Sequence, residues 1–558
     1  MQRIDGVTII SPTDLANHLA CKHLTWLNLK SLDTGIAPRK LDDDLLEVLK
    51  SYGEEHEATY LAALEASLQA LKRTVVDLDA RRDKDSAYTR DELMKRMSTT
   101  VAAMKSGPDA LYQPTFYSEK DGFGWVGRAD FLVAVDEIIS QLGNYAFQPY
   151  DTKLARIAKV NALIQLCAYA EQIQGVQGLE PEFIHVVTGS EEEGTVSVRL
   201  SEVSAYYRRV KQSLVDALLE SPEHSEPVPN EHCDVCRWRA ECKAYWRKVD
   251  DLTFVAGMSA TNREKLRAVG ITKLEELANR NEVKTDINPD VLSRLRKQAT
   301  LQLITKSKQE IDPETLPETE FIRPVERGRG FSLLPEKNAG DIFYDIEGHA
   351  YLGSKGLEYL HGLAWVDTDG TPQYKAIWAH DAEEERKALI EVIDFINSRI
   401  AMPDHENLRI YHFGHYEPSA LKRLATRHVT CETELSKLLR EGRFVDLSRI
   451  VTQGMRIGVE SYSIKKLERM YGFKRNDLVE EGKLSIVCYE DWLASRSTAE
   501  YAPEGNIKHL DDLKMYNKND CFSTIELRNW LESQRALLAE ASPIPELNDL
   551  VRPSLNKL

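Results

Sequence analysis

Long apolar stretches are absent from this chain of 558 residues. No apolar run approaches the roughly 18 to 20 residues that a membrane-spanning helix needs, and residues 1–10 lack the apolar core of a secretory signal. We therefore expect a cytoplasmic protein without a membrane partner. The chain also contains no Gly-x4-Gly-Lys-Ser/Thr sequence, which excludes a recognisable P-loop ATPase.

Cysteine is scarce as well, and acidic residues outnumber basic ones. Eight cysteines in a chain of this length, without an export signal, argue against a disulfide framework. Cys167, Cys431, Cys488 and Cys521 follow no spacing pattern, so we expect them to be reduced thiols. The formal net charge of −17 gives no global support for nucleic-acid binding, although a local basic groove can lie on an acidic protein.

The length exceeds what one hydrophobic core usually supports, so several domains are expected. Composition and periodicity predict an α/β multidomain protein with five parts: residues 1–248, a small helical segment at 249–305, an extended linker at 306–340, an α/β domain at 341–540 and a tail at 541–558. The same patterns predict helices at 12–28, within 42–106, at 160–173 and at 383–398, and strands at 122–135, 145–153, 342–346, 358–366 and 409–413.

Four cysteines enclose the first part of the chain. Cys21 stands alone, whereas Cys233, Cys236 and Cys242 form a Cys-x2-Cys-x5-Cys cluster. From chemistry alone, four thiolates can hold zinc or an iron–sulfur cluster, or remain without metal. Zinc sites usually contain two close cysteine pairs, so a distant cysteine joined to a close trio favours iron–sulfur. We expect such a cluster to close the domain.

Acids and a lysine lie between these cysteines. In a strand through Asp151 and Lys153, the two-residue period places both side chains on one face. Asp151 can hold a divalent ion, Lys153 can orient a water or balance charge on the phosphate, and Asp130 can add a carboxylate from a neighbouring strand. An isolated Asp-x-Lys is more often a surface charge pair, so the surrounding residues decide its meaning.

Three further residues accompany this set. Gln165 and Tyr169 are four apart and share a helix face, from which they can contact DNA or support the metal ligands. His56, in an earlier helix, can supply an imidazole ligand. The full order of these residues and the cysteine cluster resembles the RecB-type branch of the PD-(D/E)XK nucleases, in particular its iron–sulfur members.

This resemblance covers about residues 1–248. It implies a restriction-endonuclease-like fold with a central mixed sheet flanked by helices, and dependence on Mg²⁺ or Mn²⁺. It also implies a 4Fe–4S cluster on Cys21, Cys233, Cys236 and Cys242, with zinc as the alternative.

A second acidic set lies near the end of the chain. Asp345 and Glu347 are two apart in an apolar strand and therefore share a face. Tyr516 and Asp520 are four apart and face together if helical. Two metal ions about 4 Å apart, held by such acids, would activate a water and stabilise the leaving oxygen. Tyr516 can orient that water.

These residues resemble the DEDD exonuclease superfamily with the RNase H-like fold, in particular its tyrosine-bearing subgroup and the YprB-like proteins. The resemblance covers about residues 341–535. Glu417 stands where aspartate is usual and is assigned the third metal role, while Asp446 lies where the superfamily often has a non-catalytic aspartate. The alternative is a nuclease-like fold that has lost activity and only grips nucleic acid.

The segment between the two sets is less informative. Residues 257–272 look like a helix-hairpin-helix, a motif that can offer backbone amides to a phosphate. A single copy serves equally well as a structural spacer, so both interpretations stay open.

Together these features predict a metal-dependent DNA nuclease, acting on single strands or free ends in repair, recombination or defence. The tandem order looks like a family whose longer members continue into a superfamily 1 helicase. Two alternatives stay open, a standalone member and the front half of a larger protein, and any unwinding would come from a helicase in cis or in trans. The alternatives are a non-catalytic nucleic-acid-binding scaffold and, for the second domain, an RNA substrate.

Overall fold

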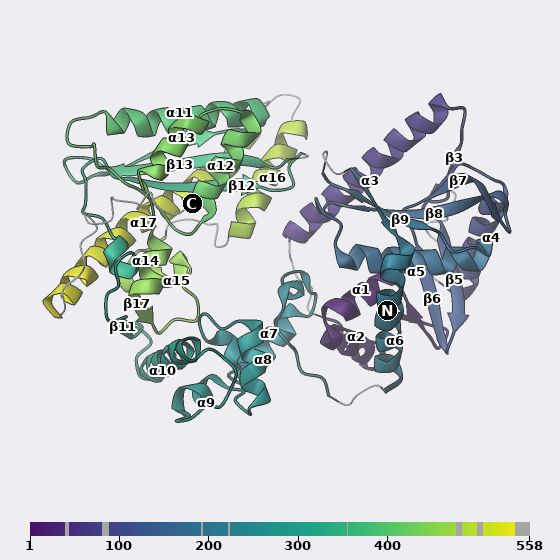
Figure 1. The fold of residues 1–558 in the computed structure, drawn as a ribbon, viewed down its shortest axis with the longest axis horizontal. Helices are drawn as coiled ribbons and strands as arrows, with labels where there is room; N and C mark the ends of the chain where they lie inside the picture. Colours follow the sequence, from purple (N-terminus) through teal and green to yellow (C-terminus); the bar gives the residue numbers. More distant parts are fainter. Residues whose placement is uncertain are drawn as a thin grey trace, which may run out of the picture. The chain divides into compact units, whose positions relative to one another are not determined.

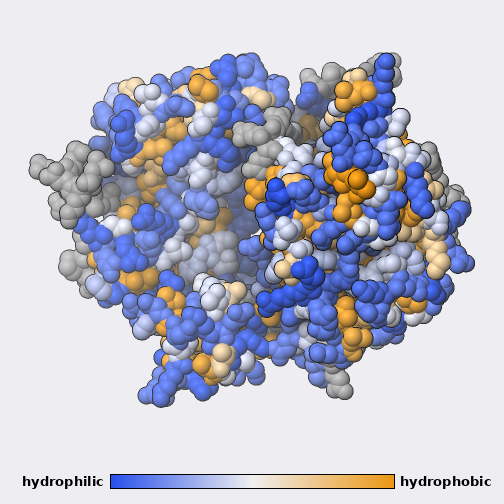
Figure 2. Space-filling model, turned by 45° about the vertical axis from the view of Figure 1, so that its right-hand side comes forward, coloured by the Kyte–Doolittle hydropathy of each residue, from blue (hydrophilic) through white to orange (hydrophobic). Residues whose placement is uncertain are grey.

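The computed structural model describes residues 1–38, 44–80, 89–190, 194–220, 224–353, 355–475, 482–498 and 506–541. These residues form two compact units, Met1–Tyr245 and Trp246–Leu558 (Figure 1). None of the described helices is long and apolar enough to cross a membrane. On the face shown in Figure 2, hydrophobic side chains lie in separate patches among hydrophilic ones. Of the expected tail at 541–558, all but the first residue lies outside the described part.

The N-terminal unit contains two sheets. A six-stranded sheet has the order β10-β9-β8-β7-β4-β3, and a four-stranded sheet has the order β1-β2-β6-β5. The larger sheet is mixed, because β7 pairs with β8 antiparallel while β8 pairs with β9 parallel. The strands are β1 (Gln2–Ile4), β2 (Val7–Ile10), β3 (Val75–Asp77), β4 (Ala110–Tyr112), β5 (Thr115–Lys120), β6 (Phe123–Arg128), β7 (Phe131–Ser140), β8 (Gly143–Lys153), β9 (Phe183–Thr188) and β10 (Thr195–Arg199).

Helices cover these sheets. They are α1 (Pro12–Ala20), α2 (Lys22–Thr34), α3 (Asp44–Ala70), α4 (Arg90–Lys105), α5 (Val160–Gln177), α6 (Leu200–Glu220) and α7 (Arg239–Lys248), with a 3-10 turn at Glu231–Val235. Helix α5 buries nine of its eighteen residues, and its Ile164, Leu166 and Ile173 enter one core with Phe147 of β8 and Val186 of β9. Burial of these side chains fixes α5 against the strands that carry the predicted acids.

Three expectations for this unit need correction. The predicted helix at 12–28 is two helices, because Cys21 has extended backbone angles, with φ −157° and ψ 108°, and separates α1 from α2. The predicted strand at 122–135 is broken before β7, where Asp130 leaves the strand geometry. The predicted helical run at 42–106 contains strand β3, and its residues 42–43 and 81–88 lie outside the described part.

The C-terminal unit is built on a five-stranded sheet with the order β14-β13-β12-β15-β16. β12 pairs antiparallel with β13 and β13 with β14, whereas β15 is parallel to both β12 and β16. A separate two-stranded sheet joins β11 to β17. The strands are β11 (Thr319–Phe321), β12 (Ile342–His349), β13 (Leu357–Val366), β14 (Pro372–Trp378), β15 (Ile410–His412), β16 (Phe444–Asp446) and β17 (Met455–Ile457).

Helices lie on both faces of the five-stranded sheet, with α11 on one side and α17 on the other (Figure 1). The helices of this unit are α8 (Ala260–Ala268), α9 (Leu274–Asn279), α10 (Pro289–Ile311), α11 (Ala382–Ile400), α12 (Tyr416–His428), α13 (Glu432–Arg440), α14 (Leu447–Gly454), α15 (Ile464–Tyr471), α16 (Gly482–Thr498) and α17 (Ile507–Ala541), with 3-10 turns at Leu252–Phe254 and Gly330–Leu333. The predicted strands at 342–346 and 358–366 and the predicted helix at 383–398 are confirmed.

Strand β12 faces two different cores, because successive side chains point to opposite sides of a strand. Tyr344 and Ile346 pack in the core that contains Leu389 of α11, whereas Phe343 packs in the core that contains Ile525 of α17. Asp345 has the parity of Phe343, so it faces α17. The second acidic set therefore lies between the sheet and this helix.

The segment expected to be an extended linker is largely ordered. Its first residues continue α10, which ends at Ile311, and β11 pairs with β17. On α10, the Gln298 amide donates to the backbone carbonyl of Ile457 over 2.8 Å. The Gln298 side-chain oxygen also accepts a hydrogen bond from the Tyr462 hydroxyl. These hydrogen bonds dock the small helical segment on the sheet domain, because a buried amide whose donor and acceptor are both paired favours a single arrangement.

Candidate metal centres

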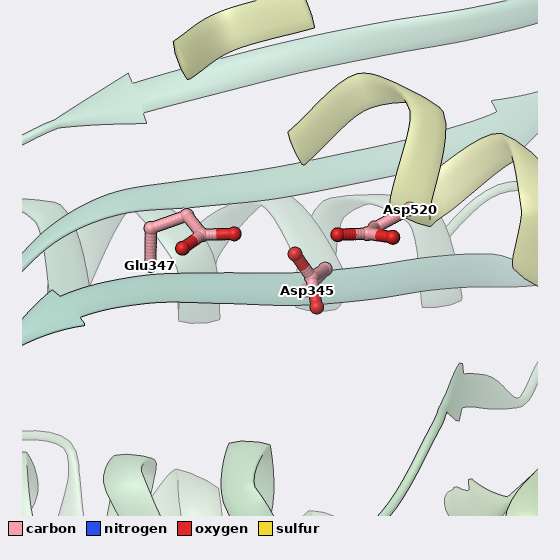
Figure 3. Close-up of side chains that lie close together, drawn as sticks. All are labelled: Asp345, Glu347 and Asp520. Carbon is pink, nitrogen blue, oxygen red and sulfur yellow. The ribbon is translucent and has the colours of Figure 1, made fainter. Parts of the chain in front are cut away.

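Three carboxylates meet between β12 and α17. Asp345, Glu347 and Asp520 each offer an oxygen within 4.8 Å of the others. Figure 3 shows the carboxylates of Glu347 and Asp520 pointing toward each other, with Asp345 between them on the strand. Over the described ranges, no other set of three or more His, Cys, Asp or Glu side chains meets this spacing. The structure thus brings together three residues separated by as many as 175 positions.

A glycine permits this approach of helix to strand. Gly362 of β13 lies opposite Asp345 in the ladder. A Cβ atom at Gly362 would lie 1.7 Å from Asn517 Oδ1 and 3.1 Å from Cys521 Sγ, both on α17. Only a residue without a side chain lets α17 come this close, and Asp520 reaches the strand as a result.

Hydrogen bonds orient two of the acids. Asn517 Nδ2 donates to Asp345 Oδ2 over 2.7 Å, and the side-chain oxygen Oδ1 of Asn517 accepts from the Tyr374 hydroxyl over 2.7 Å. Ser485 Oγ donates to Glu347 Oε2 over 2.9 Å. These polar neighbours fix carboxylate orientation in the way that supporting residues do around metal ligands.

A cation lies beside the third acid. Arg475 Nη2 is 2.5 Å from Asp520 Oδ1 and 2.6 Å from Glu468 Oε1. Glu468 also accepts from Ser523 Oγ over 2.9 Å. Arg475 therefore bridges two buried carboxylates. The sequence contains no motif signal that would have singled out Arg475, Ser485 or Asn517.

Burial and mutual repulsion make the three acids difficult to ionise. Burial raises the pKa of Glu347 to about 8, and the charge of Asp520 adds to this rise. Burial, followed by the charges of Asp520, Glu347 and Glu417, raises the pKa of Asp345 well above its usual range. Burial also raises the pKa of Asp520, although Arg475 opposes the rise. A bound cation would relieve all three shifts.

Tyr516 and Glu417 lie outside this group of three. Tyr516 is buried one helical turn before Asp520, and the Lys465 ammonium lies 4.7 Å from the centre of its ring. Glu417, in the first turn of α12, is 4% exposed and its Oε2 lies 3.3 Å from His412 Nδ1. Asp446 caps α14 by accepting from Ser448 N over 2.9 Å, which is a structural role.

Comparison with known protein families bears on this part of the chain. A family model described as the RNase_H superfamily matches residues 342–532. Residues 342–532 form an RNase H-like domain. The prediction of this domain from the sequence is confirmed, and the three-acid group lies inside it. No curated protein matches the sequence.

The N-terminal unit holds the other predicted acidic set, separate from the RNase H-like domain. On β8, Lys153 Nζ lies 2.5 Å from Asp151 Oδ2, and Asp151 is 2% exposed. Asp130, just before β7, accepts from Thr152 N over 2.7 Å and from Thr152 Oγ1 over 2.8 Å. The structure therefore brings Asp130, which directly precedes β7, together with Asp151 and Lys153 on the neighbouring strand β8.

The electrostatics of this set resemble those of the three-acid group. Burial raises the pKa of Asp151 to about 7, with Asp130 adding to the rise and Lys153 opposing it. The pKa of Lys153 is raised, because the charges of Asp151, Asp130 and Glu57 together outweigh the lowering effect of burial. A buried acid balanced by one lysine and crowded by a second acid is suited to binding a further cation.

The three residues predicted to accompany these acids, Tyr169, Gln165 and His56, have different contacts. Tyr169 is buried near the acids, whose charges add to the effect of burial in raising its pKa. Gln165 Nε2 donates instead to Thr13 Oγ1 over 3.4 Å, toward α1. His56 Nε2 lies 3.3 Å from the carbonyl oxygen of Val187. Glu57, which motif reasoning missed, accepts a hydrogen bond from Gln113 Nε2.

The four predicted cysteine ligands are neighbours. Cys21 lies at the junction of α1 and α2 and packs with Cys236 in one small core that also contains Leu24 and Trp238. Burial raises the pKa of Cys242 to about 12, and the charges of Cys236, Cys233 and Cys21 add to the rise. Such thiols need a cation to become thiolates at neutral pH.

The helix-hairpin-helix-like segment uses its own backbone amides. Gly270 N donates to Arg267 O, and Ile271 N donates to Leu266 O, each over 3.0 Å. Thr272 N donates to the Glu276 carboxylate over 2.7 Å. These three amides are thus engaged within the segment, which favours the spacer interpretation over DNA contact.

Proposed function

We propose that this chain is a metal-dependent nuclease that hydrolyses phosphodiester bonds in DNA. The observation that carries the proposal is the convergence of Asp345, Glu347 and Asp520 within the RNase H-like domain. An all-oxygen donor set of this kind suits Mg²⁺ or Mn²⁺. Cations bound there would activate a water molecule and stabilise the leaving oxygen.

The residues around the three acids support this chemistry. Asn517 and Ser485 hold Asp345 and Glu347 in fixed orientations, and Tyr516 would orient the attacking water. Glu417 would serve as the fourth acid after a change of its side-chain conformation. Because catalytic geometry is sensitive to shifts of about 1 Å, these supports matter as much as the ligands.

The proposal extends to a second nuclease centre of the RecB-like PD-(D/E)XK type in the N-terminal unit. Support comes from the chain order β7, β8, α5, β9, in which two antiparallel strands are followed by a helix and by a strand parallel to β8. Further support comes from the Asp151–Lys153 ion pair beside Asp130. In that role Lys153 would stabilise charge developing on the phosphate.

For the four cysteines we propose a 4Fe–4S cluster that ties the α1–α2 junction to the end of the unit. Thiolates bound to one zinc at about 2.3 Å would lie within about 4 Å of one another. No three of the described cysteines come within 4.8 Å of one another, which suits a larger inorganic core better than a single ion. We further propose that the substrate is DNA with free or single-stranded ends and that a helicase is a partner of the chain.

A labelled single-stranded DNA digest with Mg²⁺ or Mn²⁺ tests both centres. We expect at least one of the variants Asp345→Asn and Lys153→Ala to lower cleavage by at least about tenfold, equivalent to about 1.4 kcal/mol in barrier. The double variant should abolish cleavage. If both single variants and the double variant cleave like the wild type, the proposed function is wrong, and parallel RNA digests show whether the RNase H-like domain prefers RNA.

A further inference from the structure

We propose that Lys465 of α15 binds a non-bridging oxygen of the scissile phosphate at the three-acid centre. The inference rests on the proposed nuclease function of the RNase H-like domain, and it adds to the three acids a cationic residue that contacts the substrate. The ligand of Lys465 is the anionic phosphodiester, whose oxygens gain negative charge as the attacking water adds to phosphorus.

Helix α15 is fixed against the acid-bearing part of α17. Leu467 of α15 is fully buried in the core that also contains Ile525 of α17. Glu468 accepts a hydrogen bond from Ser523 Oγ of α17 over 2.9 Å. Lys465 precedes Glu468 by three residues, so these two side chains lie on the same face of α15. The face that carries Lys465 is therefore directed toward α17.

The Lys465 side chain reaches the centre at Tyr516. Its ammonium lies 4.7 Å from the centre of the Tyr516 ring, and Tyr516 lies one helical turn before Asp520 on α17. The Cζ atom of Arg475 lies 5.9 Å from the same ring centre. Two cations are therefore gathered around the tyrosine that would orient the attacking water.

These two cations differ in what they contact. Arg475 Nη2 is 2.5 Å from Asp520 Oδ1, and its Nε donates to Glu468 Oε1 over 2.9 Å. The Lys465 ammonium contacts the Tyr516 ring, and a hydrogen bond to a charged phosphate oxygen is stronger than such a cation–π contact. The flexible stem of a lysine also lets its ammonium turn from the ring to the phosphate. Lys465 is accordingly better placed than Arg475 to exchange this contact for the substrate.

The charge of Lys465 acts on two of the three acids. Burial and the charge of Asp520 raise the pKa of Glu347, while Ser485 and Lys465 oppose the rise. Burial also raises the pKa of Asp520, while Arg475 and Lys465 oppose that rise. A cation that acts on both acids from outside the ligand set is suited to stabilise a phosphate bound beside them.

Single-turnover cleavage of labelled single-stranded DNA by the full-length chain tests the inference. The N-terminal centre is first silenced with Lys153→Ala. In this background Lys465→Met, which removes the charge and keeps an unbranched side chain, is compared with Lys465→Arg and with Lys466→Met, a change of the exposed neighbouring lysine. We expect Lys465→Met to lower the rate at saturating DNA by at least about tenfold, because the contact is strongest in the transition state. Lys465→Arg should retain more of the rate, and Lys466→Met should retain all of it.

Mn²⁺ binding and thermal unfolding distinguish a substrate contact from a structural role. Electron paramagnetic resonance should show no loss of Mn²⁺ binding in Lys465→Met, because removal of a positive charge does not weaken a nearby cation site. The melting temperature should match that of Lys466→Met. Weaker Mn²⁺ binding or a lower melting temperature alongside slower cleavage would make the role of Lys465 structural and overturn the inference. A change confined to the DNA concentration that gives the half-maximal rate would place Lys465 at a neighbouring phosphate and overturn it as well.

Asp345→Asn in the same background separates the inference from the proposed function. If Asp345→Asn slows cleavage and Lys465→Met does not, the inference falls and the proposed function stands. If the Lys153→Ala chain does not cleave DNA, or if Asp345→Asn leaves its cleavage unchanged, the proposed activity of the RNase H-like domain is wrong, and so is the role of Lys465.

Discussion

Gly362 lies directly opposite Asp345 in the antiparallel pairing of β13 with β12. Because Gly362 has no side chain, the Asn517 side chain of α17 occupies the position that a Cβ atom would take. The strand that carries two acids and the helix that carries the third are thereby brought to contact distance. The geometry of the three-acid group therefore depends on Gly362, although this residue offers no side-chain ligand.

Substitution Gly362→Ala should destabilise the RNase H-like domain. The added Cβ would lie 1.7 Å from Asn517 Oδ1, so α17 must shift, at a cost of about 1–3 kcal/mol. We expect a lower melting temperature and, because Asp520 moves with α17, weaker Mn²⁺ binding. Gly175→Ala is the control, since a Cβ there meets open space within a helix, and it should be neutral or slightly stabilising. Equal effects of the two variants would contradict this role for Gly362.

The stability of the metal-free chain should fall as the pH rises from about 5 to about 8. Glu347 has a folded-state pKa raised to about 8, so the folded state holds a proton that the unfolded state has released, and this contribution is lost as the pH passes the folded pKa. The effect is on the order of a few kcal/mol. Glu347→Gln should flatten the pH dependence of thermal unfolding, and Mg²⁺ should flatten it in the wild type. An unchanged slope in Glu347→Gln would remove Glu347 as the cause.

Arg475→Gln should lower the stability of the metal-free chain by on the order of 3 kcal/mol, because Asp520 and Glu468 would lose the cation between them. Scanning calorimetry with and without Mg²⁺ measures the change, and Mg²⁺ should restore part of the lost stability through Asp520. Lys466→Gln, an exposed cation on α15, is the control and should change stability little. The assignment fails if Mg²⁺ restores nothing.

Removal of one cysteine should release the proposed cluster. Anaerobically purified wild type should contain iron and absorb visible light, and Cys236→Ala should lose both along with thermal stability of the N-terminal unit. Cys167→Ala, in a buried cysteine of α5 outside the set, should keep the iron. Elemental analysis that finds zinc in place of iron would select the other metal, and neither element in the wild type would refute a metal at this position.

Local patterns were sufficient for much of this structure. The apolar strand with Asp345 and Glu347 could be predicted because a two-residue period acts over only a few residues, and α5 because its apolar face is continuous. The break at Cys21 could not be predicted, because neither flanking segment contains proline or glycine at that point and only tertiary packing favours the extended backbone there. The ordered residues within 306–340 were missed because their partners, on β17 and in the sheet domain, are far away in the sequence.

The same division holds within the two sites. The amino-acid order alone was enough to identify the acids, the lysine and the cysteines as candidate ligands, because the motifs that contain them consist of residues at short, fixed spacings. Only the tertiary structure decided that Asp520 meets β12 and that Arg475 neutralises it. The rotation of a helix about its axis and its approach to a sheet depend on packing against distant side chains, which a one-dimensional pattern does not contain.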